Sequence, residues 1–143
     1  MYQSILVPTD GSELSLRAAD AAIALAKALG ARLVAWSSAE VYSLPFAEQV
    51  YVDQTLYVEE AMKEAATNAQ AVATRAADAG VACQAFSGMS DSIWEGIINA
   101  ASEHGCDLIF MASHGRRGMA ALLLGSETQK VLTHSKLPVL VYR

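Results

Sequence analysis

The chain has few of the residues that mark metal-binding, nucleic-acid-binding or membrane-spanning proteins. Among its 143 residues are two cysteines, Cys83 and Cys106, with no CxxC spacing and no ligand spacing to a histidine. We interpret them as buried reduced thiols rather than a metal site. Lysine and arginine number 10 against 15 aspartates and glutamates, a net charge of −5, so nucleic acid and anionic membrane are poor partners. No apolar run approaches the ~20 residues of a membrane span, which predicts a cytoplasmic protein.

What the chain has in abundance is apolar residues. Hydrophobic residues make up 53% of the sequence and charged residues 17%, a composition typical of a globular fold with a well-buried core. At this length we expect one domain, spanning residues 1–143. We find no internal repeat.

Strand and helix patterns alternate along the chain. Short apolar runs predict buried parallel strands over residues 4–8, 32–36, 81–86, 107–113 and 137–142. Helical spacing of apolar residues predicts helices over 14–29, 58–79, from a cap at Ser90 and Asp91 to a stop before Gly105, and over about 126–134. Ser12 and Gly30 have the chemistry of caps for the first helix. Residues 39–57 have no sustained period.

This alternation predicts an α/β fold of Rossmann-like type, with an open parallel sheet and helices on both faces. Ligands in such folds bind outside the carboxyl ends of the strands, where the strand order reverses. The first and fourth strands both end in glycine-bearing turns. If these strands are neighbours, the turn at Asp10 and the loop at Gly115 face one cleft.

The most informative stretch follows the fourth strand. It runs Ser113-His114-Gly115-Arg116-Arg117-Gly118, and Gly125-Ser126 then opens a helical pattern. Backbone N–H groups and a helix N-terminus directed at one spot hold a phosphate without a catalytic side chain. Two simpler interpretations stay open: the glycines permit a surface loop, and Ser126 is only an N-cap.

These motifs carry a family resemblance. Ile5-Leu6-Val7-Pro8-Thr9-Asp10-Gly11-Ser12, together with the glycine loop and Pro138-Val139-Leu140-Val141, resembles the universal stress protein family over essentially the whole chain. The resemblance implies a five-stranded sheet of order 3-2-1-4-5 and a homodimer formed through the last strand, here Pro138 to Tyr142. It also implies that adenine nucleotide, ATP in one branch of the family, is the ligand.

The binding motif of that branch is Gly, two residues, Gly, nine residues, Gly, then Ser or Thr. It maps onto Ala112, Gly115, Gly125 and Ser126. Alanine in the first position matters if the backbone there needs positive φ or close contact with phosphate. Glu127 is a second departure, because related sequences more often have a small apolar residue. Its carboxylate suits the helix dipole but is expected to compete with, or repel, a phosphate.

The combined reasoning predicts a nucleotide site and no catalytic residue. The predicted site residues are Pro8, Thr9, Asp10, Ser38, Met111, Ala112, His114, Gly115, Arg116, Gly118, Gly125, Ser126, Glu127 and Thr128. Asp10 either contacts the nucleotide, helps hold a phosphate-bound Mg²⁺, or simply forms an Asx-turn. Arg116 and Arg117 are either phosphate contacts or solvated loop charges. We expect ATP with Mg²⁺, and neither haem, flavin nor structural metal.

Several function classes fit these features to different degrees. The leading hypothesis is a stress-response regulatory protein that binds nucleotide as a homodimer. A slow ATPase is an alternative. Phosphoryl transfer needs metal ligands and a positioned nucleophile, and the sequence shows only one acidic residue near the site, Asp10. A phospho-receiver domain needs an aspartate at the end of its third strand, and this chain has Phe86-Ser87-Gly88 there. A family member without nucleotide binding, acting through protein contacts, is motivated by Ala112 and Glu127. A backbone cradle does not distinguish ATP from AMP or cyclic AMP.

Overall fold

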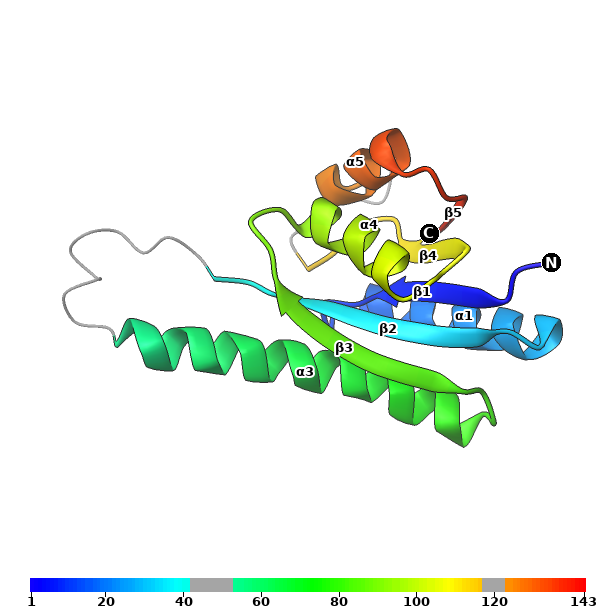
Figure 1. Ribbon diagram of the computed structural model, residues 1–143, viewed down its shortest axis with the longest axis horizontal. Coiled ribbons are helices and arrows are strands. Elements are labelled where there is room, and N and C mark those ends of the chain that lie inside the picture. Colours follow the sequence, from blue (N-terminus) through cyan, green and yellow to red (C-terminus); the bar gives the residue numbers. More distant parts are fainter. Residues whose placement is uncertain (42–52, 117–122) are drawn as a thin grey trace.

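The sheet at the centre of the molecule has the predicted order. The structure is a computed structural model and describes residues 1–41, 53–116 and 123–143. Five parallel strands lie in the order β3-β2-β1-β4-β5 (Figure 1). Their bounds are β1 Ser4–Pro8, β2 Arg32–Ala39, β3 Cys83–Met89, β4 Leu108–Ala112 and β5 Val139–Tyr142. The predicted α/β class and the strand order 3-2-1-4-5 are therefore confirmed.

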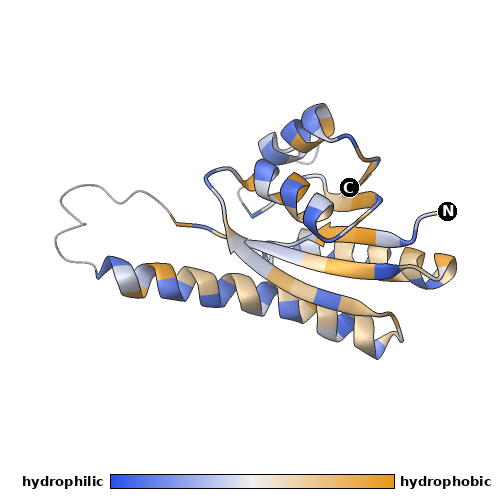
Figure 2. Ribbon diagram, viewed as in Figure 1, coloured by the Kyte–Doolittle hydropathy of each residue, from blue (hydrophilic) through white to orange (hydrophobic). Residues whose placement is uncertain are grey.

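Helices cover both faces of this sheet, as predicted. Helices α1 (Glu13–Leu29) and α3 (Gln54–Asp78) pack on one face, and α4 (Ile93–Glu103) and α5 (Ser126–His134) lie on the other (Figure 1). The central strands are buried between these layers and are the most hydrophobic part of the ribbon (Figure 2). In β1 the side chains of Ile5, Leu6 and Val7 are all fully buried, as expected for a strand covered on both faces.

Local chemistry explains how α1 begins and ends. Ser12 is its N-cap, and the Ser12 hydroxyl accepts a hydrogen bond from the N–H of Ser15 at 3.3 Å. Gly30 follows the last turn with φ of 68°, in the left-handed region that glycine enters without strain. Both caps agree with the sequence prediction. They direct the chain from the end of β1 into α1 and then into β2.

Other boundaries differ from the prediction. Helix α3 begins earlier, because the Asp53 carboxylate accepts the N–H groups of Thr55 and Leu56 and so caps it. The predicted cap of α4 at Ser90 and Asp91 is wrong. Its N-cap is Ser92, whose side chain makes no capping hydrogen bond.

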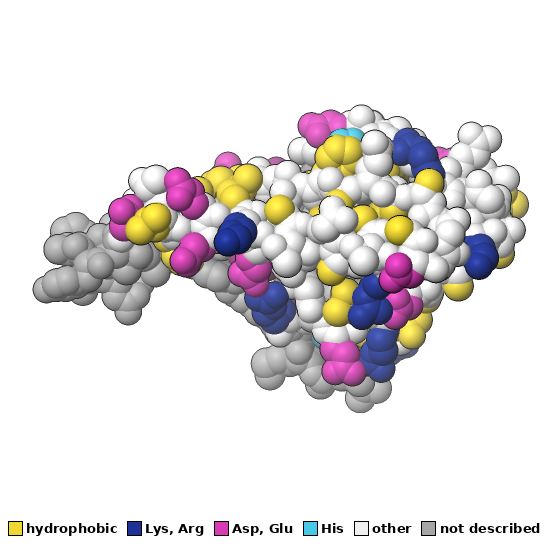
Figure 3. Space-filling view, turned by 90° about the horizontal axis from the view of Figure 1, so that it is seen from below, with side chains coloured by type: hydrophobic (Ala, Val, Ile, Leu, Met, Phe, Trp, Pro, Cys, Tyr) yellow, Lys and Arg dark blue, Asp and Glu magenta, His cyan; other side chains and the backbone are white. Residues whose placement is uncertain are grey.

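The face formed by α1 and α3 has mixed charge. Basic and acidic side chains are interspersed on it rather than gathered by sign (Figure 3). Arg75 of α3 and Asp20 of α1 form an ion pair across the two helices, at 2.8 Å. In the three described ranges, none of the helices combines the length and the apolar character that a bilayer crossing requires.

Candidate functional site

A cavity of about 410 Å³ opens at the carboxyl ends of β1 and β4, the place where this topology reverses strand order. Every predicted site residue except Gly118 lines it; Gly118 lies outside the described residues. Those lining it are Pro8, Thr9, Asp10, Ser38, Met111, Ala112, His114, Gly115, Arg116, Gly125, Ser126, Glu127 and Thr128. The two strand-end turns thus face one cleft. Whether these residues bind nucleotide remains a prediction.

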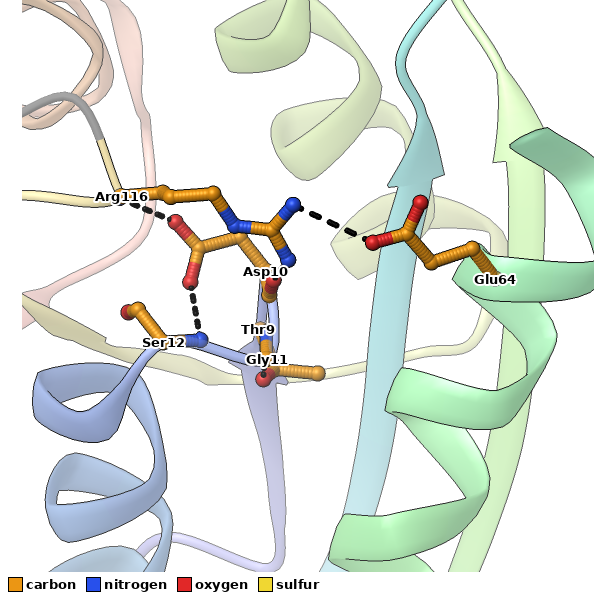
Figure 4. A network of polar contacts seen from close by, with 6 residues as sticks. All are labelled: Thr9, Asp10, Gly11, Ser12, Glu64 and Arg116. Atoms are coloured by element: carbon orange, nitrogen blue, oxygen red, sulfur yellow. Dashed lines mark hydrogen bonds and ion pairs between the residues drawn. The ribbon is translucent and has the colours of Figure 1, made fainter.

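Asp10 joins the turn after β1 to the loop after β4. Its Oδ1 accepts the N–H of Ser12 at 2.9 Å, which closes the Asx-turn anticipated from the sequence. Its Oδ2 accepts the N–H of Arg116 at 2.6 Å. Figure 4 shows the carboxylate between these two backbone segments. Each oxygen accepts one N–H and keeps a second lone pair, so these hydrogen bonds leave open the Mg²⁺ ligand role considered for Asp10.

The hydrogen bonds at Asp10 also set its acidity. Burial raises the pKa of the Asp10 carboxyl, since a low-dielectric surrounding disfavours the charged form. Hydrogen bonds from the hydroxyl and N–H of Ser12, the N–H of Arg116 and the hydroxyl of Ser15 outweigh this effect. The pKa therefore lies below its ordinary value of 3.8. The carboxylate is ionised at neutral pH and contributes stability there.

The guanidinium of Arg116 is engaged by the protein itself. Its Nη2 donates to the carbonyl oxygen of Asp10 at 2.5 Å, and its Nη1 meets Glu64 Oε1 of α3 at 3.1 Å (Figure 4). The sequence left this residue open between a phosphate contact and a solvated charge. The structure places it in a bridge among β1, α3 and the glycine loop. Arg117 lies outside the described residues.

The N-terminus of α5 is directed into the cavity. Gly125 is the N-cap and provides no side-chain cap, so Ser126 is the first helical residue and not the cap. The first-turn N–H groups have no intrahelical partner and carry the positive end of the helix dipole. The N–H of Gly125 is already bound to the carbonyl of Ser113, at 2.8 Å. The Thr128 hydroxyl likewise donates to the carbonyl of Ala112, at 3.0 Å.

Close packing accounts for the glycines of the motif. A Cβ on Gly115 would lie 2.6 Å from Asp10 Oδ2, and one on Gly125 would lie 3.0 Å from the Cα of His114. Ala112, at the position of the first motif glycine, is the last residue of β4 and pairs with Tyr142. Its backbone is therefore extended, which alanine adopts without strain. The departure at Ala112 imposes no backbone penalty here.

Glu127 does not bind the amides of its own helix. Its Oε2 accepts the N–H of Trp94 in the first turn of α4, at 2.9 Å. Lys130 Nζ lies 3.9 Å from its Oε1. The expected direct competition with phosphate for the N–H groups of α5 is thus absent from this structure, because the carboxylate is turned to a different helix. It supplies the cap that Ser92 does not.

Part of the cavity wall is apolar, and sequence reasoning missed most of it. Trp36, Val41, Ile93 and Ile97 line it together with the predicted residues. Trp36 is also part of the hydrophobic core, with 7% of its surface exposed. A signal for its second role existed: it lies two residues before Ser38 on the same strand, so both side chains are on one face of the sheet. The Ser38 hydroxyl has no hydrogen-bond partner among the described residues.

Nothing in the described site resembles a catalytic pair or a metal centre. His114 Nδ1 lies 3.2 Å from the hydroxyl of its neighbour Ser113, an adjacent contact that orients no nucleophile toward a substrate. Over residues 1–41, 53–116 and 123–143 no group of three His, Cys, Asp or Glu side chains could hold a metal ion. The arrangement offers backbone N–H groups, a helix end, an apolar wall and one guanidinium.

The chain is a doubly wound α/β domain, and its cavity lies at the ends of the central strands, where domains of this class bind small ligands. The sequence profile of the universal stress protein family matches residues 1–143. The chain is 34% identical to the universal stress protein YxiE of Bacillus subtilis, with all of both chains covered. It therefore belongs to the universal stress protein family.

Solved structures show the same architecture. A universal stress protein from Burkholderia pseudomallei superposes with a TM-score of 0.76 at 28% identity, covering 99% of this chain and 96% of that one. A universal stress protein in complex with cAMP superposes with a TM-score of 0.65 at 27% identity, covering 99% and 97%. The structural likeness thus extends over nearly the whole chain.

Proposed function

We propose that this protein is a cytosolic stress-response regulator that binds an adenine nucleotide, ATP with Mg²⁺, in the cavity between β1 and β4. The phosphates lie against the first turn of α5 and the loop at Gly115. The base lies against the apolar wall near Pro8 and Trp36, and the backbone of Ser38 contacts its edge.

The observation that carries the proposal is the open N-terminus of α5. Its N-cap is a glycine without a side chain, and the cavity that it meets also holds the turn at Asp10. A helix end of this kind attracts anions through its free N–H groups and its dipole. Support comes from the related structure that contains cAMP, which is an adenine nucleotide.

Thermal unfolding with added nucleotide tests this function. A ligand that binds only the folded protein stabilises it by about 2.7 kcal/mol at a hundredfold excess over its Kd. We expect millimolar ATP with Mg²⁺ to raise the Tm, and Ser126→Pro to abolish the rise. Proline fits the first helical position without disturbing the helix, but it removes an N–H from the cradle. If ATP, AMP and cyclic AMP all leave the Tm unchanged, the protein acts without nucleotide.

We further propose that two chains pair through β5. This strand ends the sheet, and no described strand pairs with its outer edge. Leu140 projects from it with 37% of its surface exposed. An unpaired apolar edge strand is a ready surface for a second copy.

Sedimentation measures this pairing directly. Leu140→Glu should shift the protein toward monomer, because it places charge in the paired edge. Leu29→Glu is the matched control, since Leu29 is similarly exposed, at 40%, but lies at the end of α1. An unchanged dimer in Leu140→Glu, or a monomeric wild type, would refute pairing through β5.

We do not assign catalysis to the cavity. Transfer of a phosphoryl group requires metal ligands and a positioned nucleophile, and among the described residues no group of three His, Cys, Asp or Glu side chains could hold a metal ion. We expect ATP hydrolysis at background level. Product formation that disappears in Asp10→Ala would establish an ATPase instead.

A further inference from the structure

We propose that Glu127 is a specificity-determining residue, whose fixed carboxylate makes the cavity discriminate against phosphate groups of high negative charge. This inference rests on the proposed function and deepens it. It concerns which adenine nucleotide the site accepts, and under what conditions.

The position of Glu127 is fixed from outside its own helix. Its Oε2 accepts the N–H of Trp94 at 2.9 Å, a contact between residues 33 positions apart. The α4 end is otherwise uncapped, since the side chain of Ser92 makes no capping hydrogen bond. A carboxylate at a helix N-terminus is favoured by the dipole as well as by the hydrogen bond. The side chain is thereby held at the α4 N-terminus, on the wall of the cavity.

Glu127 is also next to the proposed phosphate position. It follows Ser126 in the first turn of α5, and both residues line the cavity with Gly115. A phosphate at the first-turn amides therefore has this carboxylate as a near neighbour. Because α4 already engages the carboxylate, moving it away from a bound anion would leave the N–H of Trp94 without its partner.

Among the described lining residues, carboxylates outnumber cations. Four carboxylates line the described part of the cavity, on Asp10, Glu40, Asp91 and Glu127. Arg116 is the only lysine or arginine among the described lining residues. Its guanidinium is held by Glu64 and by the carbonyl of Asp10. Lys130 approaches Glu127 only at 3.9 Å, with half of its own side chain exposed.

Among the described lining residues, the side-chain charge that a ligand meets is therefore net negative. The phosphodiester of cyclic AMP carries a single negative charge and gains from the helix dipole with little repulsion. The triphosphate of free ATP carries several charges and is repelled by Glu127. Mg²⁺ bound to the triphosphate removes much of that difference. Binding of ATP is thus expected to depend on Mg²⁺, whereas binding of cyclic AMP is not.

Calorimetric titration with ATP and with cyclic AMP, each in Mg²⁺ and in EDTA, tests this role. The variant is Glu127→Gln, whose amide oxygen still accepts the N–H of Trp94. We expect it to tighten ATP binding in EDTA by about tenfold, the effect of one nearby charge in a partly screened site. The affinity for cyclic AMP should change by less than about threefold, because fewer charges interact. The Mg²⁺ dependence of ATP binding should fall accordingly.

The matched control is Glu95→Gln. Glu95 is in the first turn of α4, the helix whose N-terminus Glu127 caps. It is exposed and does not line the cavity. It should leave the ratio of ATP to cyclic AMP affinity unchanged. A purely structural role of Glu127 would alter both affinities equally, so an unchanged ratio in Glu127→Gln refutes this inference while the proposed function stands. If neither nucleotide binds the wild type, the proposed function itself fails.

Discussion

The carboxylate of Asp10 accepts the backbone N–H of Arg116, 106 positions along the chain, at 2.6 Å. This hydrogen bond joins the turn after β1 to the glycine loop after β4. Arg116 reinforces it by donating to the carbonyl oxygen of Asp10. The two loops that meet at the cavity are therefore held together before any ligand arrives.

Substituting Gly115 should disrupt this junction. The Cβ of Gly115→Ala would lie 2.6 Å from Asp10 Oδ2, so the carboxylate or the loop has to move. We expect a loss of about 1–3 kcal/mol in the free energy of unfolding and a weaker shift of Tm by nucleotide. Urea unfolding measures the first effect. Gly88→Ala is the control, because its Cβ would meet Trp36 only at 3.8 Å. Equal stability of the two variants would contradict this account.

Asp10 should make stability depend on pH. Its pKa in the folded protein is below the ordinary 3.8, so its contribution is present above the unfolded pKa and is lost as pH falls through the folded pKa. At pH 7 we expect Asp10→Asn to lower the free energy of unfolding by about 1–2 kcal/mol, through weaker hydrogen bonds. The difference from wild type should shrink below about pH 4. Unfolding curves between pH 7 and pH 3 measure it, and a difference that is constant with pH would contradict it.

Removing the side chain of Glu127 should loosen the start of α4. Glu127→Ala leaves the N–H of Trp94 without its partner, and we expect a loss of about 1 kcal/mol of stability. Faster amide hydrogen exchange confined to the first turn of α4 should accompany it. Glu103→Ala removes an exposed carboxylate from the last turn of α4 and should have neither effect. Uniform exchange across α4 in both variants would argue against a cap.

The ion pair of Glu64 and Arg116 should affect binding more than stability. Both side chains are more than half exposed, at 57% and 51%, and such pairs contribute about 0–1 kcal/mol. Glu64→Gln releases the guanidinium toward the cavity, so we expect a few-fold tighter binding of ATP, more at low salt than at high salt. Titration calorimetry measures it. Glu60→Gln, exposed one turn earlier on α3, should leave the affinity unchanged.

Much of the fold followed from local pattern. Buried runs such as Ile5 to Val7 predicted strands, and the caps at Ser12 and Gly30 predicted where α1 begins and ends. The end of β2 was predicted less accurately, because its stabilising partner is distant in the sequence. The pattern in β2 broke at Ser37, yet the strand continues to Ala39 because β3 pairs with it as far as Met89.

Some residues of the candidate site could likewise be predicted from local sequence, and others could not. Glycine spacing after β4 indicated the loop and the helix start, and those residues do line the cavity. Sequence could not indicate that Ile93 and Ile97 of α4 line the cavity, or that Glu64 holds Arg116. Such contacts join residues on separate elements, and their choice depends on how helices pack on the sheet.

The strand order 3-2-1-4-5 was expected only from the family resemblance, and the structure confirms it. By itself the sequence determined the alternation of strands and helices and the glycines at the strand ends. These depend on short-range periodicity, capping and steric limits, which neighbouring residues carry. Only the tertiary structure decided the partner of the Glu127 carboxylate. A charged side chain with several hydrogen-bond donors in reach adopts the contact that packing presents to it, and here packing presented the uncapped N–H of Trp94.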